Sequence, residues 1–253
     1  LSYDPARGLY TRPVARDESL RQLDAGLGYR EGATRLEIAA YRLEARDELV
    51  PEGGLDEDGL PITVNSGRTV HQGLELEGGV RLPGGVDASA YLAVQRDTLR
   101  EFVVFGSDAE GRPVAVDQSG NRIASFPAHT ARLRVRRAFG RATIEAGARR
   151  VGTIFTDNSE DERKRPWLRA VPGYVPKRID PATVVDVRAR VDLSRLAGEG
   201  RSLRLDLWVD NALDRRYVAM GYSYPTDGAY TEFYTEFFPA ATRCAFAGLA
   251  LGF

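Results

Sequence analysis

Apolar and polar residues alternate one by one through most of this chain, and that spacing is typical of β-strands. The clearest segment runs from Thr183 to Leu193. From Val185 onward its odd-numbered positions are aliphatic and its even-numbered positions are charged. No segment keeps apolar residues at helical spacing for more than about one turn before the alternation returns. The sequence therefore predicts an all-β fold whose strands have one aliphatic face and one charged face.

Short and long connections between the predicted strands alternate along the chain. The short turns lie near residues 31–33, 83–86, 139–141 and 194–200, and the long connections span roughly 50–65, 97–124, 153–180 and 212–241. The segments between them, with a last one that ends at Phe253, make about nine strands. A soluble sandwich has no reason to place every short turn at one end, whereas outer-membrane barrels have short periplasmic turns and long extracellular loops.

The two faces of the predicted strands differ in a way that suits a membrane barrel. The apolar face consists mainly of Ala, Val and Leu, and large aromatic residues such as Tyr29 and Phe139 fall at strand ends, where they suit an interfacial girdle. The opposite face carries charges of both signs and is predicted to line the interior of the barrel. This predicted lumen-facing wall includes Glu75, Glu77, Arg132, Arg134, Arg136, Asp186, Arg188, Arg190, Arg204 and Asp206. Alternation alone also allows a soluble sheet whose apolar face is covered by protein.

The composition excludes several other classes of protein. Lys and Arg number 35 against 36 Asp and Glu, so there is no basic excess that would bind a nucleic acid. With one cysteine, Cys244, and two histidines, His71 and His129, the chain has neither a disulfide framework nor the ligands of a zinc ribbon. No metal site and no cofactor are predicted, and each histidine is interpreted as a hydrogen-bonding residue at a strand end. No apolar run reaches the roughly 18 residues that a transmembrane helix needs.

Five segments, taken in chain order, resemble the C-terminal part of the barrel of TonB-dependent outer-membrane receptors. Residues 64–76 are similar to the family's N-x-G…x-G-x-E strand start, residues 126–130 to its P-x-H strand start, and residues 184–188 to the strand after a late extracellular loop. Residues 210–217 are the most specific match, because they resemble the N-L-F-D-x-x-Y signature of the penultimate strand. The end, from Phe238 through an alternating strand to Phe253, resembles the family's last strand and its terminal aromatic residue.

The resemblance covers nearly the whole chain and implies an antiparallel transmembrane β-barrel in the outer membrane of a Gram-negative bacterium. Residues 1–253 would form the C-terminal portion of that barrel, about nine of the family's roughly 22 strands around a plugged lumen. Bacterial barrels have an even number of strands, and the family's plug domain and earlier strands have no counterpart in this sequence. The chain begins at Leu1 without an initiator methionine or a signal-peptide pattern, so we expect a mature or truncated piece.

The function implied by the resemblance is energised uptake of a scarce ligand, such as a ferric siderophore or a large organic cofactor, by a transporter that is not an enzyme. The implied partners are the TonB energy-transducing complex, reached through the absent plug, the barrel-assembly machinery, and outer-membrane lipid and lipopolysaccharide. The assembly machinery would recognise the last strand through Leu249, Leu251 and Phe253.

Two groups of loop residues are candidate ligand contacts. The first group is aromatic and suits stacking on a planar or catecholate ligand. It consists of Tyr222, Tyr224, Tyr230, Phe233 and Tyr234, which an interfacial girdle with a packed loop explains equally well. The second group, Arg163, Arg165 and Trp167, could hold an anionic chelate or lipopolysaccharide phosphates. A solvated charge run is the simpler interpretation of this second group.

Two alternatives stay open from the sequence. An outer-membrane β-barrel hydrolase would need a nucleophile with a histidine base. Thr130 is next to His129, but alternation points the two to opposite faces, and no serine is recognisably paired with a histidine. No catalytic residue is therefore assigned. A soluble β-sheet binding module or adhesin would bury its aliphatic face against protein and dissolve without detergent.

Overall fold

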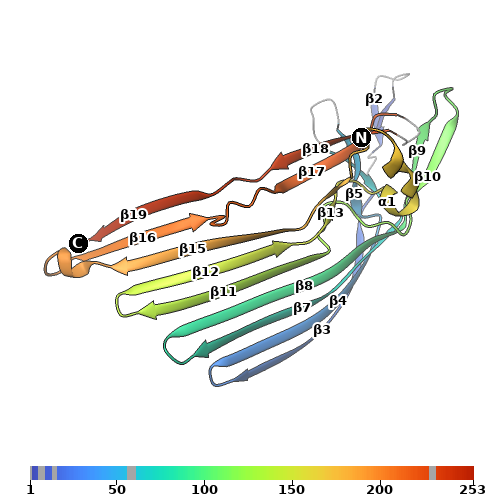
Figure 1. The fold of residues 1–253 in the computed structure, drawn as a ribbon. Helices are drawn as coiled ribbons and strands as arrows, with labels where there is room; N and C mark the ends of the chain where they lie inside the picture. Colours follow the sequence, from blue (N-terminus) through green and yellow to red (C-terminus); the bar gives the residue numbers. More distant parts are fainter. Residues whose placement is uncertain (1, 5–8, 13–15, 56–60, 228–231) are drawn as a thin grey trace.

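One antiparallel sheet forms the body of the protein (Figure 1). The computed structural model describes residues 2–4, 9–12, 16–55, 61–227 and 232–253. Within these residues, nine strands pair in the order in which they follow one another in the sequence, so the predicted set of about nine antiparallel strands is confirmed. They are β3 (Ser19–Glu31), β4 (Thr34–Arg46), β7 (Arg68–Leu82), β8 (Val86–Glu101), β11 (His129–Phe139), β12 (Ala142–Val151), β15 (Ala182–Asp192), β16 (Ser202–Asp210) and β19 (Cys244–Gly252).

Short turns join these strands in pairs at one end of the sheet (Figure 1). All four turns contain a glycine with positive φ, namely Gly32 at 53°, Gly84 at 79°, Gly140 at 54° and Gly198 at 86°. Glycine adopts this backbone conformation without the steric penalty that a Cβ atom would bring. The fourth turn is longer and contains the 3₁₀ turn η2 (Ser194–Leu196). The turns therefore lie where the sequence predicts them.

The long connections at the other end contain two-stranded sheets that extend beyond the main sheet. They pair β5 (Leu49–Leu55) with β6 (Pro61–Asn65), β9 (Val103–Ser107) with β10 (Pro113–Asp117), β13 (Ile154–Phe155) with β14 (Arg178–Ile179), and β17 (Val218–Pro225) with β18 (Phe233–Pro239). The helix α1 (Asp161–Lys164) and the 3₁₀ turn η1 (Pro166–Ala170) follow β13, and near the N-terminus β1 (Ser2–Asp4) pairs with β2 (Leu9–Arg12). The sequence predicted long loops here but not these pairings, because their alternating segments are short.

The register places aliphatic and charged residues on opposite sides of the sheet. Val187 of β15 is paired with Ala146 of β12 and with Val209 of β16. Its neighbour Arg188 is paired with Glu145. Because successive side chains of a strand point to opposite faces, the two rows lie on different sides. We call the first side the aliphatic face and the second side the charged face.

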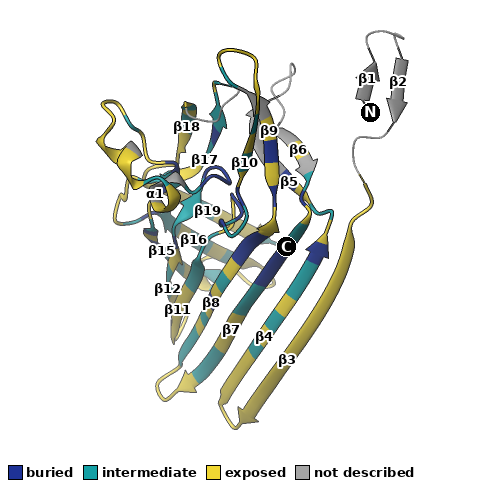
Figure 2. Ribbon diagram, turned by 90° about the vertical axis from the view of Figure 1, so that its right-hand side faces the viewer, coloured by how far each residue is buried: buried dark blue, intermediate teal, exposed yellow. Residues whose placement is uncertain are grey.

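Nothing among the described residues covers the aliphatic face. Strand β3 is exposed along its whole length (Figure 2). Large side chains of this face are exposed on distant strands as well, including Leu27 at 77%, Leu133 at 51% and Leu249 at 70%. In a soluble sheet such side chains would be buried in a core. The face has the character of a surface that contacts lipid.

The buried apolar core lies at the loop end of the molecule rather than along the sheet (Figure 2). It consists of Val50, Leu99, Phe102, Val104 and Ile123, which come from β5, β8, β9 and the connections around them. This core holds the loops together above the sheet. In the part of the chain that the structure describes, no helix is long and apolar enough to cross a bilayer.

Candidate functional site

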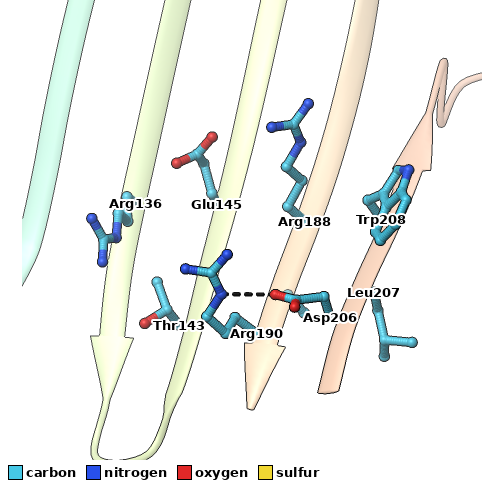
Figure 3. Close-up of a pocket in the computed structure, with 9 residues that line it drawn as sticks. Arg136, Thr143, Glu145, Arg188, Arg190, Asp206, Leu207 and Trp208 are labelled. Atoms are coloured by element: carbon cyan, nitrogen blue, oxygen red, sulfur yellow. Dashed lines mark hydrogen bonds and ion pairs between the residues drawn. The ribbon is translucent and has the colours of Figure 1, made fainter. Parts of the chain in front are cut away.

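A row of alternating charges crosses the charged face. Arg81, Asp87, Arg136, Glu145 and Arg188 are successive cross-strand partners from β7 to β15, and Figure 3 shows the last three of them side by side. Arg81 Nε donates a hydrogen bond of 2.9 Å to Asp87 Oδ1. Opposite charges placed directly across an antiparallel pair contribute about 0.2–1 kcal/mol each. The row therefore stabilises the wall and leaves little net charge along it.

The row borders a hollow of about 510 Å³ on the charged face (Figure 3). Asp206 accepts hydrogen bonds of 2.7 Å from Arg190 Nε and of 2.7 Å from Arg204 Nε. Trp208 lines the hollow and stacks on Phe246 of β19, with ring centroids 5.3 Å apart and planes inclined by 20°. This aromatic pair among charges was missed from the sequence, although Trp208 stands in the charged phase of its strand. The hollow thus offers guanidinium groups, a carboxylate and an aromatic surface.

The register places every residue of the predicted lumen-facing wall on the charged face. Toward the N-terminal edge, the Tyr91 hydroxyl donates to Glu75 at 3.3 Å and Arg35 donates to Glu77 at 3.0 Å. These pairs are exposed in the structure, and exposed ion pairs contribute at most about 1 kcal/mol. Their main effect is a polar surface with its charges largely matched.

The β17–β18 hairpin brings several of the predicted aromatic contacts together. The ring centroids of Tyr222 and Tyr224 lie 6.1 Å apart, and those of Tyr224 and Tyr234 lie 5.5 Å apart. Phe238 joins them at 5.8 Å from Tyr222. The Tyr222 hydroxyl donates to Glu236, and this hydrogen bond, together with burial, raises the pKa of Tyr222 to about 12. We call Tyr222, Tyr224, Tyr234 and Phe238 the aromatic surface of the hairpin.

Phe233, another of the predicted aromatic contacts, lies on the other side of the same hairpin. Its ring packs against the loop-end core, and Lys177 Nζ lies 3.2 Å from the ring centroid. Lys177 also forms an ion pair of 3.1 Å with Asp157, and the two side chains are only 5% and 3% exposed. Phe233 is therefore partly buried and packs against the loop-end core. The remaining aromatic prediction, Tyr230, lies outside the described residues.

The second group of predicted contacts lies in α1 and η1. Arg163 Nη2 donates to Gly120 O at 3.1 Å and to Asn121 Oδ1 at 3.0 Å, and Arg163 Nε pairs with Glu160 at 3.1 Å. Arg165 is half-buried and also has a partner. Trp167 is 61% exposed. The interpretation as an internally satisfied charge run is thus favoured for Arg163, whereas the Trp167 ring is accessible.

His71 lies between two carboxylates at the base of the loops. Its Nδ1 is 2.8 Å from Asp97 Oδ1 and its Nε2 is 3.0 Å from Glu48 Oε2. The aliphatic run of β7 begins at Leu74, so His71 lies on the loop side of the membrane-facing segment. Burial alone would lower the pKa of His71, but the hydrogen bonds and charges of the two carboxylates raise it to about 9. The imidazolium joins β7, β8 and the connection between β4 and β5, which agrees with a hydrogen-bonding role.

Raising the pH toward 9 is expected to loosen this loop base. A pKa raised from 6.5 to about 9 gives a contribution to folding that is complete below pH 6.5 and is lost as the pH rises through 9. An NMR titration of the His71 ring in detergent micelles should therefore place its deprotonation near pH 9. A ring that titrates at or below pH 6.5 would contradict the charged cluster. In the His71→Gln variant, the protection of loop amides against hydrogen exchange, corrected for the intrinsic exchange rate, should no longer change between about pH 6.5 and pH 9.

The last strand carries the predicted assembly signal at the edge of the sheet. Leu249 and Leu251 are paired with Leu205 and Leu203 on the aliphatic face. Phe253 is 91% exposed, and the guanidinium of Arg201 lies 5.7 Å from the centroid of its ring. Among the described residues, no group of three or more His, Cys, Asp or Glu side chains is arranged to hold a metal ion.

A comparison with protein families identifies the family to which this sheet belongs. Residues 8–212 match the family described as TonB dependent receptor-like, beta-barrel. The chain belongs to the TonB-dependent receptor family. TonB-dependent receptors reside in the outer membrane of Gram-negative bacteria and are transporters rather than enzymes. The resemblance to this family is thus confirmed, and family membership disfavours both alternatives, the hydrolase and the soluble β module.

Three solved structures illustrate the shared fold of TonB-dependent receptors. The siderophore receptor PiuA from Acinetobacter baumannii is 18% identical with a TM-score of 0.61, over 93% of this chain and 28% of that protein. The unliganded ferric citrate transporter FecA is 18% identical with a TM-score of 0.64, over 92% and 31%. The copper transporter OprC is 18% identical with a TM-score of 0.60, also over 92% and 31%. This chain thus spans less than a third of each, and a comparison with curated proteins finds no match.

Proposed function

We propose that this chain forms the C-terminal portion of the barrel wall of an outer-membrane active transporter. The observation that supports this most directly is the two-faced sheet of nine strands in a chain that matches the TonB-dependent receptor family over residues 8–212. In this arrangement the aliphatic face contacts lipid and the charged face lines the lumen. The long connections then lie outside the cell and the short turns lie in the periplasm.

The energy for transport would come from outside this chain. A plug domain within the barrel would be pulled by the TonB complex, which draws on the proton gradient of the inner membrane. The charged face supplies the surface along which the plug and the ligand move. Its alternating charges and the hollow beside Trp208 suit a polar surface that is contacted and released rather than a permanently packed one.

The transported ligand is proposed to be a scarce, large chelate or cofactor such as a ferric siderophore. The names of the structurally similar siderophore receptor, ferric citrate transporter and copper transporter support this class. The contacts we assign to it are the aromatic surface of the β17–β18 hairpin and the exposed ring of Trp167. Arg163 and Arg165 would contribute positive potential near the Trp167 ring rather than direct hydrogen bonds, because both already have partners within the chain.

Uptake by cells that carry the complete protein tests this proposal. A strain without the gene should lose accumulation of one labelled ligand from a panel of ferric siderophores and large organic cofactors, and an otherwise identical strain without TonB should show the same loss. Growth and uptake that do not depend on TonB for any member of the panel would overturn the transport function.

The assigned aromatic contacts can be tested separately. Tyr224→Ser/Tyr234→Ser is expected to weaken ligand binding about tenfold, since aromatic contacts contribute about 0.5–1.5 kcal/mol each. Phe105→Ser is the matched control, because Phe105 is an exposed aromatic residue on a different hairpin, β9–β10. Equal losses in both variants would contradict the assignment of the aromatic surface.

The last strand is proposed to be the part of the chain that the barrel-assembly machinery recognises. Leu249, Leu251 and the exposed ring of Phe253 form an apolar row at the end of an edge strand. An edge strand with free backbone groups is suited to pairing with another strand.

A further inference from the structure

The aliphatic face ends, toward the loops, in a band of basic side chains. On β4 the outward apolar run ends at Arg42, on β8 at Arg96 and on β12 at Arg150. Arg21 of β3 and His129 of β11 occupy the corresponding positions on their strands. We call these five residues the basic band.

The basic band crosses the tilted strands at the slope expected of residues that all lie at the same depth in the membrane. We define a row as the residues paired across successive strands, so that the next row on the same face lies two residues further along each strand. Arg42 and Arg96 share a row with Gln72 between them. Arg21 lies one row closer to the loops, and Arg150 lies two rows closer to the turns. The band therefore descends three rows, or six residues, over the five steps from β3 to β12. At about 3.4 Å per residue and about 4.8 Å per step, this slope is about 40°. Strands of outer-membrane barrels tilt by about 35–45°, so the band lies parallel to the membrane surface.

The opposite boundary of the aliphatic face has no such band. Within the nine strands, the turn side of this face carries one cation, Arg137, and one carboxylate, Glu31. The guanidinium of Arg137 lies 4.4 Å from the ring centroid of Phe139. Long cationic side chains that merely reach toward water would be equally useful at both boundaries. The asymmetry therefore points to something anionic on the loop side alone.

Neutral side chains accept hydrogen bonds from two arginines of the band, Arg42 and Arg150. Arg42 donates to Gln72 Oε1 at 2.6 Å, and Arg150 donates to Thr183 Oγ1 at 3.0 Å and to His129 Nε2 at 3.3 Å. Arg42 also pairs with Glu44 at 2.6 Å. Among the described residues, no carboxylate lies within ion-pair distance of Arg96 or Arg150. The exposed guanidinium groups of Arg96 and Arg150 are thus available to an external anion.

We propose that the basic band binds the phosphate groups of lipopolysaccharide in the outer leaflet. The loop side of the aliphatic face meets that leaflet, whose lipid combines acyl chains with phosphates at the level where the apolar residues stop. Guanidinium groups bind phosphate through paired hydrogen bonds, which fits a band in which every strong cation is arginine. The inference rests on the placement of the wall in the outer membrane, and it is independent of the ligand transported.

The test compares two pairs of arginines that lie on opposite faces of the same sheet. Arg96→Gln/Arg150→Gln removes two charges from the band. Arg132→Gln/Arg149→Gln removes two charges from the charged face, where these residues are cross-strand partners, and Arg149 directly precedes Arg150. The complete protein would be purified as the folded, heat-modifiable species and titrated in detergent micelles that contain either bis-phosphorylated lipid A or the same lipid without its phosphates. If the double band variant does not fold, Arg96→Gln alone replaces it.

We expect the unchanged protein to bind the bis-phosphorylated lipid at least about tenfold more tightly than the dephosphorylated lipid. The band variant should lose most of this difference, and the Arg132/Arg149 variant should stay within about twofold of the unchanged protein. Equal losses in the two variants would overturn the proposal, because they would reflect net charge alone. Binding that does not respond to the phosphates would overturn it as well. Loss of ligand uptake is not a readout here, so failure of the transport function would leave this result unaffected.

Discussion

Val187→Arg is expected to destabilise the protein in a bilayer by about 2–4 kcal/mol. Val187 lies within β15 between Ala146 and Val209, on the face with no protein over it in the described part of the chain. The substitution would place a charged group against lipid hydrocarbon, where few polar partners are available. Urea unfolding of the complete protein in phosphatidylcholine vesicles, followed by tryptophan fluorescence, measures the loss.

Arg188→Ala is the matched control for this variant. Arg188 is the next residue of the same strand and belongs to the charged row opposite Glu145. Its removal should have a much smaller effect, because exposed charge pairs contribute at most about 1 kcal/mol. Equal destabilisation by the two substitutions would mean that the assigned phase of the strand is wrong.

Asp157→Ala is expected to cost about 3–5 kcal/mol in the stability of the loop-end assembly, because it removes the carboxylate from a buried ion pair and leaves the lysine charge behind. Lys177 and Asp157 are 5% and 3% exposed, and the ammonium group also lies against Phe233. The ion pair therefore connects the β13–β14 connection with the β17–β18 hairpin. Hydrogen exchange of the amides of residues 118–124 and 156–159 reports local opening without requiring the barrel to unfold.

Asp108→Ala provides the comparison for an exposed ion pair in the same region. Asp108 pairs with Arg112 at 2.6 Å, and the arginine side chain is 71% exposed. We expect less than about 1 kcal/mol for this change. If the exposed and the buried substitutions opened the loops to the same extent, the buried pair would not be what holds the loop end together.

The wall could be predicted from the sequence because one of its faces is repetitive. In β15 and β16 the aliphatic residues occur at every second position, and this fixes both the strand and its orientation. The alternation of aliphatic and charged residues is hard to follow in the sequence after Ala40, but the strand does not end there. β4 continues to Arg46 with the register unchanged. The alternation fades there because the outward side chains change from aliphatic to basic at Arg42.

The loop end could not be predicted in the same way, since its packing depends on residues far apart in the chain. Phe233 and Tyr234 are adjacent aromatic residues in the same loop sequence. The Phe233 ring packs against the core, whereas the Tyr234 ring is exposed. Nothing local in the sequence distinguishes the two. The same holds for Lys177, whose partner Asp157 is separated from it by α1 and η1. His71 was correctly taken as a hydrogen-bonding residue, but its two carboxylate partners come from β8 and from the connection between β4 and β5.

The two-stranded sheets in the long connections also bear on how quickly such a wall can form. β5 and β6 bring the end of β4 to the start of β7, where Ser66 N donates to Glu48 O at 2.7 Å. Once β5 and β6 have paired, the segment that still has to be closed between β4 and β7 is short, and closing a short loop costs less entropy than closing a long one. We expect the pairing of consecutive strands to propagate from the hairpins in the long loops as well as from the short turns. Each strand of the nine-stranded sheet pairs only with the strands before and after it in that sheet, which keeps the loops to be closed shorter than a crossover topology would.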